Sequence, residues 1–172
     1  GLLGEIKPSD SELLRSVLFK GAKQVAYVTG ASLYNRLGLT TQIPKTVSIA
    51  TNGARQVKDL DTIRIRYKVS KAPISIDNVK LLELLDVIKD IKAISDTRPE
   101  SVFNWLIKKL DSISSNELMK LSDLAISYYP ASVRAILGLA CELKGDKKNA
   151  PLLKGSLNPL TRYNIGLNHA LA

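Results

Sequence analysis

The apolar residues of the N-terminal part recur at helical spacing over short stretches. From Ser9, whose pair with Glu12 has the form of a capping box, this spacing continues as far as Leu18. A short strand over residues 24–28 and a second short helix over residues 31–37 are expected to follow. The chain therefore begins with two short helices on either side of a strand.

The period changes to two from Thr46 to Val69, which is typical of strands. Asn52-Gly53 lies between two alternating runs, and this dipeptide is the strongest short-range signal for a two-residue hairpin. We therefore expect residues 46–51 to pair with residues 54–58, and a tight connection to lead into a further strand over residues 62–69. The pattern predicts a small antiparallel β-meander with one basic face exposed to water. The basic side chains expected on that face of the last strand are Arg64, Arg66 and Lys68.

Helical spacing returns after Pro73 and lasts until Gly145. Four consecutive helices are expected there. Their N-terminal signals are, in chain order, Asp77, Thr97 with Glu100, Ser114 with Glu117, and Pro130. The inner face of the fourth helix includes the single cysteine, Cys141, which we interpret as a core thiol that cannot form an intramolecular disulfide.

Locally connected strands followed by a run of helices are typical of an α+β fold rather than of alternating βαβ units. We predict one α+β domain over residues 1–145, with short N-terminal helices, the antiparallel β-meander and a four-helix C-terminal half. The pattern weakens over residues 146–172, which we expect to form a C-terminal tail packed on the same domain.

The composition narrows the class of protein. Apolar residues make up 45% and charged residues 24% of the 172 residues, which is typical of a folded domain rather than a disordered chain. No run approaches the roughly 18 apolar residues of a membrane span, and no leader opens the sequence, so we expect a cytoplasmic protein without a membrane partner. Because the chain begins at Gly1 and its only methionine is Met119, we expect it to be either a domain of a longer protein or a product from which a tag has been trimmed.

The net charge of +9 is concentrated in the predicted sheet, since residues 45–71 carry seven basic and two acidic side chains. A surface of this kind can bind phosphates or an acidic protein surface, although a sheet face also needs polar residues simply to meet water. The candidate partner-binding or nucleic-acid-binding residues are Arg55, Lys58, Arg64, Arg66, Lys68 and Lys71.

Residues that could carry out catalysis do not converge in the sequence. The single histidine, His169, has no nearby Asp or Cys to orient it, and one Cys and one His cannot form a zinc site. Glu83, Asp86 and Asp90 share a helix face, but lysines are interleaved with them, as on an ordinary solvated face. The glycines form no phosphate-binding loop. We therefore predict a protein that is not an enzyme and has no metal ion and no cofactor.

The run Tyr34-Asn35-Arg36-Leu37-Gly38-Leu39-Thr40-Thr41-Gln42-Ile43-Pro44, followed by a strand and Asn52-Gly53, resembles a segment of the AbiEi-type antitoxins of bacterial toxin-antitoxin (abortive infection) systems. The similarity extends from about Ser9 to Gly145. Leu37 and Leu39 flank a glycine cap, and fold maintenance alone would account for the motif. A functional patch is the alternative, and its members would be Tyr34, Asn35, Thr40, Thr41 and Gln42.

The resemblance implies an antitoxin domain that neutralises a partner nucleotidyltransferase-like toxin, by binding it, by modifying it or by protecting its target. In full-length relatives this activity is coupled to transcriptional autoregulation, with operator DNA read by an N-terminal winged helix-turn-helix. Nothing before Ser9 could form such a domain, so operator binding would depend mainly on a region missing from this sequence. The alternative function is a transcriptional regulator module that binds nucleic acid through the basic sheet face.

Overall fold

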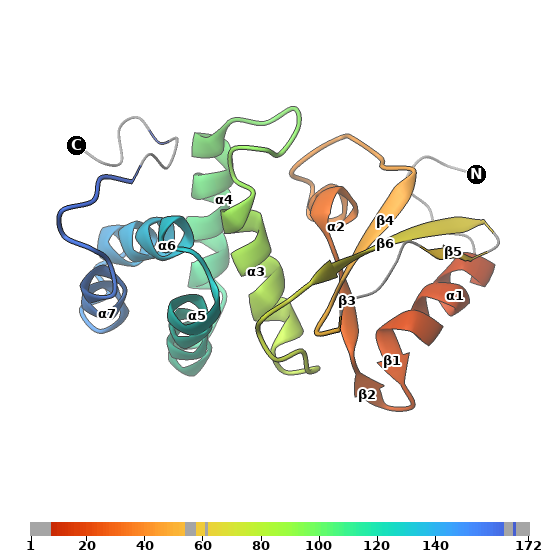
Figure 1. Ribbon diagram of the computed structural model, residues 1–172. Helices are drawn as coiled ribbons and strands as arrows, with labels where there is room; N and C mark the ends of the chain where they lie inside the picture. The colour runs from red at the N-terminus through yellow and green to blue at the C-terminus, as the bar shows by residue number, and fades with distance from the viewer. Residues whose placement is uncertain (1–7, 54–57, 61, 164–166, 168–172) are drawn as a thin grey trace. The chain divides into compact units, whose positions relative to one another are not determined.

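The computed structural model describes residues 8–53, 58–60, 62–163 and 167, and the chain divides into two compact units, residues 1–83 and 84–172 (Figure 1). The sequence pattern instead predicts one domain over residues 1–145, followed by a tail over residues 146–172. All the described strands belong to the first unit, and the described part of the second unit contains only helices and their connections. The α+β class predicted from the sequence is confirmed.

The first unit is built on a four-stranded sheet and a separate two-stranded ribbon. Its elements are α1 (Pro8–Leu18), β1 (Phe19–Lys20), β2 (Lys23–Gln24), β3 (Ala26–Thr29), α2 (Gly30–Arg36), β4 (Thr46–Thr51), β5 (Lys58–Leu60) and β6 (Ile63–Val69). Ser9, expected as an N-cap, lies inside α1. The strand expected over residues 24–28 is divided at Val25, whose N–H donates to the carbonyl of Leu18 at 2.8 Å and so closes the ribbon instead of continuing the strand.

The order of the sheet is β3-β4-β6-β5, and the predicted meander is wrong at its first turn. β4 pairs antiparallel with β3 on one side and parallel with β6 on the other. Both hydrogen-bonding edges of β4 are therefore occupied, and no edge is left for a hairpin through Asn52-Gly53. Residues 54–57, its expected partners, lie outside the described residues. The second predicted turn is confirmed, because Leu60 of β5 pairs with Ile63 of β6 in an antiparallel hairpin.

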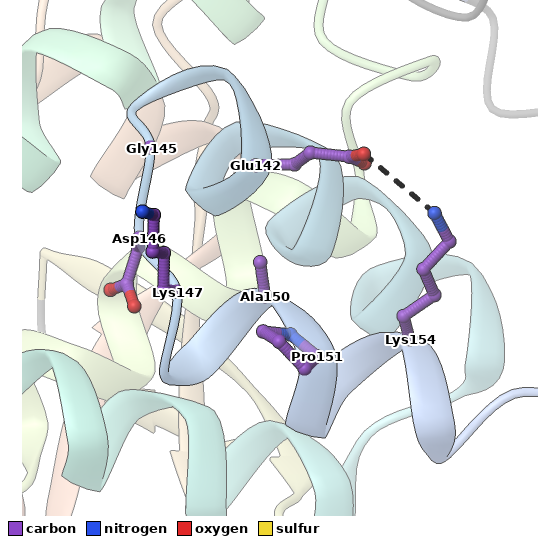
Figure 2. Close-up of a pocket in the computed structure, with 7 residues that line it drawn as sticks. All are labelled: Glu142, Gly145, Asp146, Lys147, Ala150, Pro151 and Lys154. Atoms are coloured by element: carbon purple, nitrogen blue, oxygen red, sulfur yellow. Dashed lines mark ion pairs between the residues drawn. The ribbon is translucent and has the colours of Figure 1, made fainter.

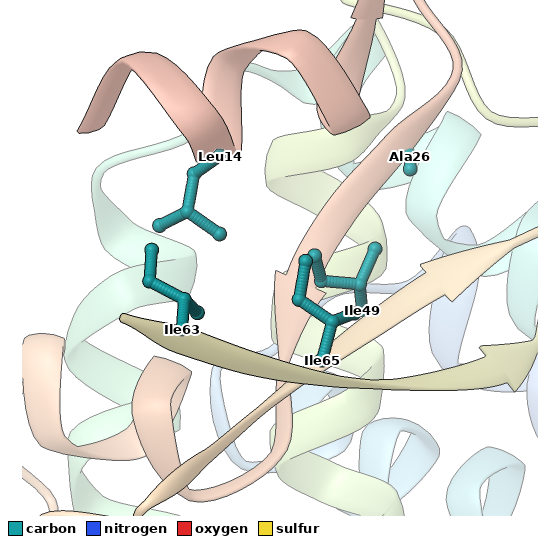
Figure 3. Close-up of a cluster of buried hydrophobic side chains, with 5 residues drawn as sticks. All are labelled: Leu14, Ala26, Ile49, Ile63 and Ile65. Carbon is teal, nitrogen blue, oxygen red and sulfur yellow. The ribbon is translucent and has the colours of Figure 1, made fainter. Parts of the chain in front are cut away.

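One face of this sheet forms the hydrophobic core of the first unit (Figure 3). Ile49 of β4 and Ile65 of β6 are fully buried there, next to Ala26 of β3 and Ile63 of β6. α1 covers this face with Leu14, and Leu13, Val17 and Leu18 pack against the cluster. Burying an aliphatic side chain of this size contributes about 1.5–3 kcal/mol, so this face fixes the register of the strands.

The opposite face is only partly open to water, which corrects the expectation of one wet face. α2 contacts both β3 and β4. It begins at Gly30, whose φ is +67°, and a Cβ there would lie 3.2 Å from the Cβ of Ser48 on β4. Tyr27 and Thr29 of β3 are buried on this face, as is Ala50 of β4. Among the described residues, the exposed side chains on this face belong to β6 and to Asp59 of β5, which pairs with Arg64.

The second unit contains the end of α3 and four further helices (Figure 1). The helices are α3 (Val79–Lys89), α4 (Pro99–Asp111), α5 (Ser115–Tyr128), α6 (Ala131–Leu143) and α7 (Asn149–Gly155). The four predicted helices are present, but α7 was not expected, because Pro151 and two flanking lysines obscure its short apolar pattern. α7 packs on α6, where Leu153 is fully buried and a Cβ on Gly138 would lie 3.3 Å from the Cβ of Leu153.

The predicted N-terminal signals of these helices have different outcomes. Ser114 is the N-cap of α5, and its side chain accepts a hydrogen bond from the N–H of Glu117 at 3.1 Å. The N-cap of α4 is Arg98 rather than Thr97, and no side chain caps this helix. Asp77 lies in the turn before α3. The N–H of Val79, the first residue of the helix, donates to the carbonyl of Ser75 at 3.0 Å, and the carbonyl of Asn78 accepts from the N–H groups of Leu81 and Leu82.

Cys141 is fully buried on the inner face of α6, as predicted. Burial, helped by the nearby charge of Asp146, raises the pKa of its thiol to about 12. The thiol is therefore protonated and inert in the folded protein. Among the helices that the structure describes, none has the length and apolar character needed to cross a lipid bilayer.

Candidate partner-binding surface

The exposed basic side chains of β6 form a row, which we call the basic strip: Arg64, Arg66, Lys68 and, just beyond the strand, Lys71. The predicted alternation along β6 is confirmed, because Ile63 and Ile65 are buried and the three basic residues between and after them are exposed. Residues two apart on a strand point to the same face and lie about 7 Å apart. The strip thus places like charges at regular intervals along one strand.

The cations of the strip are largely available to a partner. Arg64 lies 3.5 Å from Asp59 of β5, but both side chains are more than 60% exposed, so this ion pair contributes little. Within the described part of the chain, Arg66, Lys68 and Lys71 form no salt bridge.

Hydroxyl groups of β4 lie beside the strip in the parallel ladder. Thr46 is paired with Arg64, and Ser48 with Arg66. The Nζ of Lys68 lies 3.7 Å from the position that a Cβ on Gly30 would take, so the strip reaches the start of α2. The sequence pattern does not indicate these hydroxyls, because the partner that it predicts for β4 is wrong.

The remaining predicted basic residues are placed differently. Arg55 lies outside the described residues. Lys58 is in β5, paired with Ile65 in the ladder. Lys71 follows β6 in a segment that Asn52 holds, since the Nδ2 of Asn52 donates to the carbonyls of Ser70 at 3.0 Å and Ala72 at 2.6 Å.

Asn52 therefore connects the ends of β4 and β6 instead of forming the predicted hairpin turn. Its Oδ1 also accepts from the N–H of Ile74 at 3.4 Å, so a single side chain makes three hydrogen bonds to one backbone segment. The sequence contains no signal for this role, because the bonded residues are 18 to 22 positions away.

The family-motif residues divide into buried and exposed members. Tyr34 and Thr40 are buried, whereas Thr41 and Gln42 are exposed. The Nδ2 of Asn35 donates to the carbonyl of Thr40 at 3.2 Å, and the Oγ1 of Thr40 accepts from the N–H of Gln42 at 3.1 Å. These bonds shape the loop after α2 and provide a structural reason for the motif.

The glycine cap inside this motif has the expected geometry. Gly38 has φ +75°, its N–H donates to the carbonyl of Asn35, and the N–H of Leu39 donates to the carbonyl of Tyr34. These two bonds form a Schellman motif, which ends α2 and turns the chain toward β4.

The acidic residues of α3 do not form a cluster that could hold a metal ion. Glu83 forms an ion pair with Arg36, and Asp86 accepts a hydrogen bond from the hydroxyl of Tyr129 at 2.7 Å. No group of three or more His, Cys, Asp or Glu side chains suited to a metal ion occurs among the described residues. His169 lies outside them.

The second unit contains a hollow of about 320 Å³ between the end of α6 and α7 (Figure 2). Ala150 and Pro151 form its floor, the turn from Gly145 to Lys147 lines one side, and Glu142 and Lys154 line the other. Gly145, with φ +75°, ends α6 in a second Schellman motif and sets the direction in which the chain leaves that helix.

Asp146 stabilises the turn that leads into α7, the helix that carries Ala150 and Pro151. Its Oδ1 accepts from the N–H groups of Lys148 at 2.9 Å and Asn149 at 2.8 Å, and its Oδ2 accepts from the Nδ2 of Asn149 at 2.9 Å. Burial alone would raise the pKa of this carboxyl, but these hydrogen bonds and the charge of Lys148 outweigh it and lower the pKa below its ordinary value. The carboxylate is thus held by hydrogen bonds within the turn before α7.

Comparison of the chain with family models, with curated proteins and with solved structures gave no match.

Proposed function

We propose that this chain is an AbiEi-type antitoxin domain that neutralises a nucleotidyltransferase-like toxin in the bacterial cytoplasm by binding it through the basic strip. The observation that carries the proposal is the row of exposed cations on β6, together with Lys71 just after it. Arg66, Lys68 and Lys71 have no ion-pair partner among the described residues. The motif from Tyr34 to Pro44 supports the family assignment as a resemblance in sequence.

The surface chemistry favours a protein partner over single-stranded nucleic acid. Proteins that bind single strands stack bases on exposed aromatic side chains. Tyr67 packs against the core cluster beneath α1, and Tyr27, which shares the face of the strip, is buried. The strip therefore offers charge and hydroxyl groups but no stacking surface within the described residues.

The partner surface that fits the strip is acidic. Three cations about 7 Å apart along a strand complement carboxylates arranged along a helix or strand of the toxin. Complementary charge of this kind raises the association rate and makes binding sensitive to salt.

The test is rescue of growth in cells that express the toxin encoded by the adjacent gene. The wild-type chain is expected to restore growth, and the double variant Arg66→Glu/Lys68→Glu is expected to lose that ability, because two carboxylates would face the acidic surface. The matched control is Lys20→Glu/Lys23→Glu, which reverses two exposed lysines of the β1–β2 ribbon in the same unit.

The outcomes separate the alternatives. Loss of rescue with the strip variant but not with the ribbon variant supports the proposal. Rescue by both variants contradicts binding through the strip. If the strip variant instead retains toxin binding and loses affinity for duplex DNA in fluorescence anisotropy, the strip is a nucleic-acid surface and the alternative function holds.

A further inference from the structure

All the residues that line the hollow between α6 and α7 belong to the second unit, whereas the residues of the basic strip belong to the first. At about 320 Å³ it falls within the size range of small-molecule sites and has room for a group of about ten non-hydrogen atoms. Its position is fixed by two packing features: the glycine turn after α6, and the close contact of α7 with Gly138.

The floor of the hollow is apolar. The methyl group of Ala150 points into it, next to the ring of Pro151 (Figure 2). An apolar floor favours the burial of an aliphatic or aromatic group, because the removal of such a group from water is favourable.

The charged side chains around the rim are not equally available to a ligand. Asp146 is held by three hydrogen bonds from Lys148 and Asn149, and Figure 2 shows its carboxylate turned away from the hollow. Glu142 lies 3.7 Å from the Nζ of Lys154, so each offsets the charge of the other. Lys147 forms no salt bridge among the described residues. The charge that remains free at the rim is positive.

We propose that this hollow binds an apolar carboxylate: an aliphatic or aromatic group that lies on Ala150 and Pro151, with its carboxylate oriented toward Lys147 and secondarily toward Lys154. This chemistry occurs in free carboxylic acids and in the C-terminal residue of a polypeptide. A ligand with an apolar body and one anionic end matches both the floor and the rim of the site.

The test is a titration of the whole chain followed by amide chemical shifts, with N-acetylleucine as the probe. For a ligand of this size we expect a Kd of about 1–10 mM and shift changes confined to residues 142–154. N-acetylleucinamide, which has the same body without the charge, is expected to bind about tenfold more weakly. 4-Methylpentanoate is a second probe, because it carries the carboxylate without the peptide group.

Three variants isolate the role of each charge. Lys147→Ala is expected to raise the Kd about three- to tenfold, whereas Lys148→Ala, at the adjacent exposed lysine outside the lining, leaves it unchanged. Glu142→Gln frees Lys154 and is expected to lower the Kd about twofold.

Saturable binding that requires the carboxylate and Lys147 supports the proposal. Tighter binding of N-acetylleucine than of 4-methylpentanoate then assigns the site to a polypeptide C-terminus, and the reverse order assigns it to a free acid. The proposal is overturned if the acid and the amide bind equally well, or if Lys147→Ala and Lys148→Ala have equal effects. It is also overturned if binding does not saturate by 50 mM N-acetylleucine, since the weakest Kd expected is about 10 mM.

Discussion

The two units use their cations in different ways. Residues 1–83 carry 13 basic and 7 acidic side chains, and residues 84–172 carry 12 and 9, which gives net charges of +6 and +3. In the first unit, alternate positions of β6 place Arg64, Arg66 and Lys68 on one face. In the second, Lys144 pairs with Asp111, and Lys154 lies near Glu142. A period of two collects nearby charges on one face, whereas a period of 3.6 spreads them around a helix.

The units also differ in how far apart in the sequence the residues lie that hold each element in place. β4 is held by β3 before it and by β6 after it, and Asn52 ties residues 70–74 to the end of β4. The helices of the second unit begin and end through residues within the same few turns, such as Ser114 with Glu117. Substitutions that test each unit should therefore act through distant partners in the first and through local bonds in the second.

The largest expected effect concerns Cys141, which reports on the integrity of the second unit. With its pKa raised to about 12, its thiolate at pH 8 is about a thousandfold scarcer than that of an exposed cysteine. Iodoacetamide is expected to label Cys141 at pH 8 only after denaturation, as measured by mass spectrometry. Rapid labelling of the native protein would contradict the buried position of this thiol.

Ile65→Ala should produce the largest loss of stability in the first unit. Ile65 is fully buried among side chains from α1, β3 and β4, so its truncation leaves a cavity at a meeting point of distant segments. We expect a loss of about 2–5 kcal/mol in the free energy of unfolding, measured in urea. Val69→Ala, on the same strand but 63% exposed, is the control and should change the free energy of unfolding by less than about 0.5 kcal/mol.

Asn52→Ala removes three hydrogen bonds between β4 and the segment after β6. The expected loss is about 1–3 kcal/mol. Asn52→Asp should be more harmful, because a carboxylate would face the carbonyls of Ser70 and Ala72 without donors. Hydrogen exchange at residues 70–74 should accelerate in both variants. Unchanged exchange there would mean that Asn52 does not hold this segment.

Two helix starts in the second unit provide a matched pair. Ser114→Ala removes the side-chain acceptor at the N-cap of α5 and is expected to cost about 1 kcal/mol. Thr97→Ala should change the free energy of unfolding by less than about 0.5 kcal/mol, because Thr97 lies outside the cap of α4. Equal costs in urea denaturation would show that the cap of α4 has been placed wrongly.

The smallest expected effect is the dependence of stability on pH at Asp146. Because its folded pKa is lowered, its contribution to stability is fully present above the ordinary carboxyl pKa of about 4 and is lost as the pH falls through the folded pKa. Asp146→Asn should remove this part of the acid-induced loss, so the difference in unfolding free energy between pH 7 and pH 3 should be smaller than in the wild type. An identical difference in both proteins would rule out this contribution.

The sequence predicted local features well and non-local pairing poorly. The alternation of Ile63 to Lys68, the N-cap Ser114 and the buried face of α6 depend on neighbours within a few residues, and all three are confirmed. The predicted Asn52-Gly53 hairpin was wrong because the burial of Ile49 and Ile65 beneath α1 determines which strands pair with β4. Turn propensity alone contains no information about this burial.

For the candidate site too, the sequence predicted the local features but not those that depend on distant pairing. The exposed cations of β6 followed from its alternation, but the hydroxyls of Thr46 and Ser48 beside them depend on a parallel pairing that no local signal indicates. The hollow in the second unit could not be foreseen, since it requires α7, whose short apolar pattern is interrupted by Pro151.

The most direct test of the central claim is calorimetric measurement of the affinity between the purified chain and the toxin of the adjacent gene. We predict a Kd that rises at least about tenfold between 50 and 300 mM NaCl, and a further loss of about a hundredfold for Arg66→Glu/Lys68→Glu but not for Lys20→Glu/Lys23→Glu. Wild-type affinity in the strip variant, with no dependence on salt, would contradict the claim that the exposed cations of β6 form the toxin-binding surface.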